Sequence, residues 1–121
     1  MRVFVGVAAV LAWLFGIMLL LAPAKFYAPT GMVLTPMLAT LAQAHGATLV
    51  GLGTINWLAR KAQGPGLTAV LAGNLVVQLL SLAVVIRTIT LGAGAAVAPG
   101  VVIHVVLGGG FGYFLLRNRR A

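Results

Sequence analysis

The sequence predicts an all-α integral membrane protein, a bundle of four transmembrane helices with both termini in the cytoplasm. Hydrophobic residues make up 62% of the 121 residues, and the mean hydropathy is +1.15. The eight charged side chains are all Lys or Arg, without one Asp or Glu. The chain contains four predominantly apolar runs, and the length of each is close to the roughly 20 residues needed to cross a bilayer. Since soluble domains contain about 45–50% apolar residues, a water-soluble protein is excluded.

The first helix is expected at about residues 3–22, an uncharged run between Arg2 and Pro23. This run exceeds the roughly 7–15 apolar residues of a signal peptide, so we expect it to be retained as a membrane span. Prolines and aromatic residues in the stretch 23–36 indicate a connector at the membrane surface.

The other helices are expected at about residues 37–59, 67–89 and 100–116. Arg60 and Lys61 end the second helix, and Gln63-Gly64-Pro65-Gly66 predicts a compact turn after it. A linker of small residues, 91–96, leads to the last helix. Without an internal repeat, the four helices are predicted to form a single membrane domain.

The distribution of basic residues predicts the orientation. Six flank one side of the predicted bundle and two flank the other: Arg2, Arg60, Lys61, Arg117, Arg119 and Arg120 against Lys25 and Arg87. Because cytoplasmic loops carry the excess of Lys and Arg, both termini are expected in the cytoplasm. The basic residues do not form a clustered face, so we expect anionic lipids rather than nucleic acid as their partner.

The missing residue types exclude much chemistry. Without a carboxylate side chain the chain has no paired-acid hydrolysis, no Asp-oriented triad and no acidic proton carrier. Without Cys it has no thiolate nucleophile and no Cys-based metal site. Small multidrug exporters are similar in length, but they depend on a membrane-embedded Glu. A non-enzymatic protein is therefore expected.

Polar residues lie along two of the predicted helices at helical spacing. Asn74, Gln78 and Ser81 share one stripe of the third helix, and His45, Thr48, Leu52 and Asn56 share one of the second. The simpler interpretation is that hydrogen bonds between such stripes fix helix pairing. Glycines predict close helix packing in the same way. The candidates are Gly46, Gly51, Gly53, Gly108 and Gly112.

The two histidines, His45 and His104, are expected in the same leaflet. They allow three ligand hypotheses: a haem held by both imidazoles, a magnesium tetrapyrrole held by His104 beside Gly100, or a quinone or sterol-like site. The alternative is that each imidazole hydrogen-bonds a neighbouring helix.

Three stretches carry a family resemblance. They are Gly46-Ala47-Thr48-Leu49-Val50-Gly51-Leu52-Gly53-Thr54-Ile55-Asn56-Trp57-Leu58-Ala59-Arg60, Gly73-Asn74, and Phe111-Gly112-Tyr113-Phe114-Leu115-Leu116-Arg117. The chain resembles small bacterial four-helix inner-membrane proteins, loosely similar in layout to the DoxX-like proteins, in which a glycine-rich second helix ends in a Trp-Leu-Ala-Arg-type border. The resemblance implies a four-helix bundle in a bacterial cytoplasmic membrane and carries no established activity.

We therefore expect an accessory or structural subunit that packs against a larger membrane protein assembly. Its positive charges would meet acidic residues or lipids of that assembly. The alternative is a small carrier for an amphipathic ligand (quinone, haem, pigment or lipid) held between the second, third and fourth helices. The candidate ligand-binding residues are His45, Asn74, Gln78 and His104.

Overall fold

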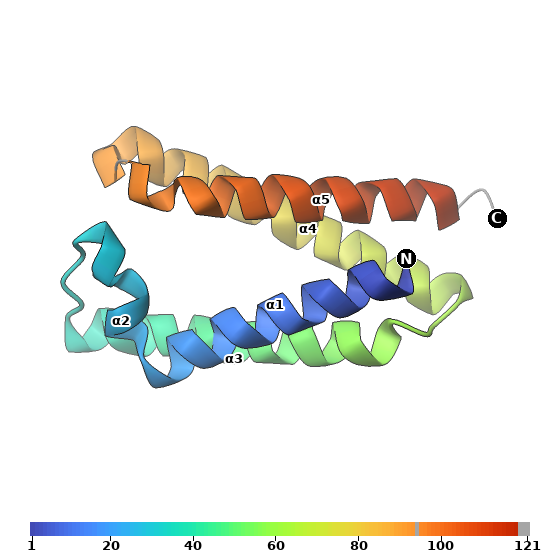
Figure 1. Ribbon diagram of the computed structural model, residues 1–121, viewed down its shortest axis with the longest axis horizontal. Helices are drawn as coiled ribbons and strands as arrows, with labels where there is room; N and C mark the ends of the chain where they lie inside the picture. The colour runs from blue at the N-terminus through green and yellow to red at the C-terminus, as the bar shows by residue number, and fades with distance from the viewer. Residues whose placement is uncertain (94, 119–121) are drawn as a thin grey trace. The chain divides into compact units, whose positions relative to one another are not determined.

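The computed structural model describes residues 1–93 and 95–118, and no strand occurs among them. The predicted all-α class is confirmed. The chain divides into two compact units, Met1–Arg60 and Lys61–Ala121, each built around a pair of antiparallel helices (Figure 1). That the two units act as a single domain stays a prediction.

The first unit is built from α1 (Arg2–Leu21) and α3 (Pro36–Ala59). α1 ends because Ala22 leaves the helical region (φ −146°, ψ 56°) and Pro23 has no N–H to continue the hydrogen-bond ladder. Between the two helices lie a short helix, α2 (Pro23–Tyr27), and a 3-10 turn, η1 (Ala28–Thr30). The connector at the predicted membrane surface is thus partly helical.

The second unit contains α4 (Gly64–Thr88) and α5 (Ala98–Asn118), joined by two short turns, η2 (Ile89–Ala93) and η3 (Ala95–Val97). At the other end of this pair, Asn118 Nδ2 donates a hydrogen bond to Thr68 Oγ1 over 2.9 Å. The buried apolar side chains of the described part of this unit are Leu67, Leu71, Phe111 and Leu115.

The long helices occupy the four apolar runs, and their ends differ from the expected ones by three residues at most. The largest difference is at α4, which begins at Gly64 where we expected a turn through Gly66. Pro65 explains this difference. In the first helical turn the missing proline N–H has no intrahelical partner to lose, and its fixed φ suits the helix. Pro99 has the same place in α5.

Three helical segments of the described chain are long and apolar enough to cross a membrane: Arg2–Leu21, Gly64–Gly92 and Ala98–Asn118. α3 has 24 residues but does not reach the same hydropathy, because Gln43, His45 and Asn56 interrupt its apolar sequence. The chain is thus compatible with a multi-pass membrane protein, and α3 as a fourth span stays a prediction.

Burial supports a membrane environment independently of hydropathy. Among the described residues the buried polar side chains are the amides of Asn56, Asn74 and Gln78, which are only 1%, 3% and 6% exposed. Large aliphatic side chains lie outside, such as Val3 and Leu21 with 79% and 80% exposed. Such an arrangement would be costly in water and is suited to lipid.

Candidate functional site

Glycines bring α1 and α3 into close contact at two places. A Cβ added to Gly46 would lie 2.7 Å from the carbonyl oxygen of Gly16 and 2.9 Å from the backbone nitrogen of Leu20. A Cβ on Gly53 would lie 2.6 Å from Cδ1 of Trp13 and 2.9 Å from the carbonyl oxygen of Ala9. These distances are shorter than real Cβ contacts. Glycine at both positions is therefore required for the observed spacing of the two helices.

The other glycine candidates differ from these two. No described atom outside the local helix backbone lies within 4 Å of a Cβ on Gly51, which is exposed. A Cβ on Gly108 would lie 3.3 Å from the Cβ of Gln78, and one on Gly112 would lie 3.8 Å from Cδ1 of Leu75. α5 therefore approaches α4 closely at Gly108 and with ordinary contact at Gly112.

Gly16 was not among the residues expected from the sequence to pack helices. It lies at the end of a buried small-residue stripe with spacing of four, Ala8, Ala12 and Gly16. This small-xxx-small spacing is the sequence signal that could have identified the α1 partner of Gly46.

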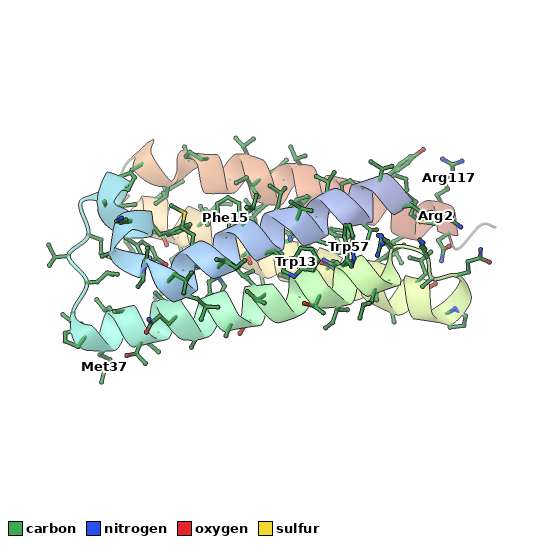
Figure 2. The ribbon with its side chains drawn as sticks, turned by 60° about the horizontal axis from the view of Figure 1, so that its bottom comes forward. Arg2, Trp13, Phe15, Met37, Trp57 and Arg117 are labelled. Atoms are coloured by element: carbon green, nitrogen blue, oxygen red, sulfur yellow. The ribbon has the colours of Figure 1, made fainter. Side chains whose placement is uncertain are left out.

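An aromatic and cationic stack also lies along the α1–α3 contact. The ring centroids of Trp13 and Trp57 are 5.4 Å apart, and Cζ of Arg60 lies 3.7 Å from the Trp57 ring centroid (Figure 2). Nε1 of Trp13 donates to Oγ1 of Thr54 over 3.2 Å. We call Trp13, Trp57 and Arg60 the Arg–Trp–Trp stack. This stack was not among the contacts expected from the sequence.

Helix packing buries only part of the polar stripe of α3. Asn56 is buried, whereas His45 and Thr48 are exposed. The α1 contact follows Ala42, Gly46 and Gly53, the buried small residues of α3. His45 lies away from this line, and its imidazole makes no hydrogen bond within the described residues.

In the second unit, the structure joins two of the candidate ligand-binding residues. Nδ1 of His104 lies 2.7 Å from Oε1 of Gln78, across the α4–α5 pair. Since an amide oxygen only accepts, Nδ1 carries the proton and donates it to this bond. Asn74 is buried one turn earlier in α4, and its Nδ2 donates to the carbonyl oxygen of Val70 over 2.9 Å.

These contacts bear on the tetrapyrrole hypotheses. A Cβ on Gly100 would lie 3.5 Å and 3.7 Å from the two γ-methyl groups of Val85, which is ordinary van der Waals contact. Val85 of α4 thus lies beside Gly100 in the direction of a Cβ, and the magnesium-tetrapyrrole hypothesis stays a prediction. His45 belongs to the first unit and His104 to the second, so the paired-imidazole haem stays a prediction.

Comparisons of the chain with protein-family models, with curated proteins and with solved structures gave no match. The DoxX-like resemblance therefore stays a prediction.

Proposed function

We propose that the chain is a non-enzymatic accessory subunit of a bacterial inner membrane, and that it packs against a larger membrane protein assembly. In this proposal α3 is the fourth transmembrane span and both termini lie in the cytoplasm. Anionic lipids and the subunits of that assembly are its partners. The single observation that carries the proposal is the contrast between the outer surfaces of α1 and α3.

The outer surface of α1 suits lipid. After Arg2 its exposed residues are all bulky and apolar, and five of them at helical spacing are 42–79% exposed: Val3, Val7, Val10, Leu14 and Ile17. Lipid chains solvate such side chains as well as a protein neighbour would, so this face needs no protein partner.

The middle of the outer surface of α3 has a different composition. Five exposed residues lie there over two turns, and we call them the α3 outer patch: Ala44, His45, Ala47, Thr48 and Gly51. The Thr48 hydroxyl donates to the carbonyl oxygen of Ala44 in its own helix over 3.1 Å. Small residues with a free imidazole gain little from lipid but allow a neighbouring backbone to approach and hydrogen-bond.

The ligand-carrier alternative has weaker support. Gln78 and His104 bond each other, and the Asn74 amide bonds its own helix. Polar groups already engaged within the α4–α5 pair are less available to orient a ligand. We therefore favour helix pairing as the role of Gln78 and His104.

The test is purification from native membranes in mild detergent at low salt, followed by mass determination. The wild-type chain is expected to co-purify with a defined set of membrane proteins. Ala47→Leu should abolish this association, since it places a bulky side chain in the α3 outer patch. Ala83→Leu, the same change at an exposed position of α4, is the matched control and should retain it. A stable lone monomer with nothing bound would contradict the proposal.

A further inference from the structure

Arg60, the residue after α3, is held by Trp57 of α3 and lies close to α1. Its guanidinium lies over the Trp57 ring with Cζ 3.7 Å from the centroid, and its Nη1 donates to the carbonyl oxygen of Trp57. Its Cδ lies 3.9 Å from the position that a Cβ on Gly6 would take. Stacking on an indole restricts the guanidinium and leaves its other N–H groups oriented away from the ring face.

The charge held there has no acidic side chain in this chain to neutralise it. Arg2 lies four residues before Gly6 in α1, so it belongs to the same face one turn nearer the helix end. Figure 2 shows Arg2 at that end of α1, beyond Trp57. Two guanidinium groups at the same end of the α1–α3 pair repel each other unless an anion lies between them or close by.

We propose that Arg60, oriented by Trp57 and assisted by Arg2, binds the phosphate group of an anionic phospholipid. Guanidinium groups match the geometry of phosphate oxygens and form paired hydrogen bonds with them. An indole at a membrane border lies at headgroup depth, where a lipid phosphate is found. This inference names one site for the anionic lipids of the proposed function, and it does not depend on the accessory role.

The chain itself supplies the reporter for this site. Its two tryptophans, Trp13 and Trp57, both belong to the Arg–Trp–Trp stack. Purified protein in neutral detergent is titrated with phosphatidylglycerol while the tryptophan fluorescence is measured. We expect a saturable change for phosphatidylglycerol and none for phosphatidylcholine. The midpoint, which is the phosphatidylglycerol concentration at half of the fluorescence change, should rise with added salt, because salt screens the charge attraction.

Arg60→Gln removes one charge and the stacked guanidinium. It should raise the phosphatidylglycerol midpoint about fivefold, the ratio that corresponds to about 1 kcal/mol per surface charge. Arg87→Gln removes the same charge from the last turn of α4 and is the matched control, with an expected midpoint equal to wild type. Arg60→Lys keeps the charge without the planar fork, and an intermediate midpoint is expected.

Circular dichroism melts identify any variant that fails to fold. If Arg60→Gln fails to fold, the midpoint of Arg60→Lys is compared with that of the wild type instead. Equal effects of Arg60→Gln and Arg87→Gln would overturn the proposal, because the lipid would then respond only to net charge. The same fluorescence change with phosphatidylcholine would overturn it as well. A matching change with inorganic phosphate alone would replace the lipid with a free phosphate ion. None of these results depends on whether a partner protein co-purifies.

Discussion

At the scale of single residues, the polar groups are the most informative part of this chain. The Gln78–His104 hydrogen bond joins two helices, whereas the hydroxyl of Thr48 donates to a carbonyl oxygen of its own helix. Only a bond of the first kind contributes to the choice of a helix partner. The stripe of Asn74, Gln78 and Ser81 indicated which face of α4 is polar, but one helix alone does not reveal which residue on another helix will meet it.

We predict that Gln78 and His104 are energetically coupled. Gln78→Leu and His104→Leu should each destabilise the protein, and the double variant should be more stable than the sum of the two effects implies. The coupling is expected at about 0.6–1.7 kcal/mol, the range for hydrogen bonds between transmembrane helices. Unfolding of the purified protein in mixed micelles measures this double-mutant cycle.

The control for this cycle pairs Gln78→Leu with Val102→Ala, an exposed position two residues before His104 on α5. These two effects should add within about 0.5 kcal/mol, because the Val102 side chain is mostly exposed and forms no hydrogen bond with Gln78. Additivity of the Gln78 and His104 variants themselves would mean that their bond does not stabilise the α4–α5 pair.

At the scale of helices, the sequence predicted the number and approximate bounds of the long helices, because apolar run length and proline positions are local properties. It did not predict which glycines touch another helix. Gly46 and Gly51 are five residues apart on α3, yet only Gly46 faces α1 closely. The difference depends on the register between two helices, which a single helix cannot reveal. For the same reason, the sequence did not reveal that Asn56 is buried whereas His45, on the same predicted stripe, is exposed.

Gly46→Ala and Gly51→Ala should therefore have opposite effects. The new methyl at residue 46 meets the backbone of Gly16 and Leu20, which cannot rotate away, so we expect a loss of about 1–3 kcal/mol in stability. At residue 51 the methyl has open space, and alanine has the better helix propensity by up to about 1 kcal/mol. Thermal melts in detergent compare the two variants. Equal losses would show that α1 and α3 do not pack as described.

At the scale of the whole molecule, the charges within each unit agree with the predicted orientation. In the first unit Arg2 and Arg60 lie at one end of the α1–α3 pair and Lys25 lies in the connector at the other. In the second unit Arg117 lies in the last turn of α5, at the Asn118–Thr68 end, while Arg87 lies in the last turn of α4. In the second unit Lys61, which precedes α4, adds a second charge to the Arg117 end. Each pair therefore has a more basic end, which the positive-inside rule would place in the cytoplasm.

The topology can be decided with three cysteine variants, since the chain has no cysteine of its own. Val33→Cys, Gln63→Cys and Leu91→Cys place a thiol at exposed positions after α1, after α3 and after α4. If α3 crosses the membrane and the N-terminus is cytoplasmic, a membrane-impermeant maleimide added to intact cells should label residues 33 and 91 and leave residue 63 unlabelled until lysis. The inverted orientation gives the opposite pattern. If only the three most apolar helices cross, residues 33 and 63 lie on the same side and residue 91 lies on the other, so each arrangement has its own labelling pattern.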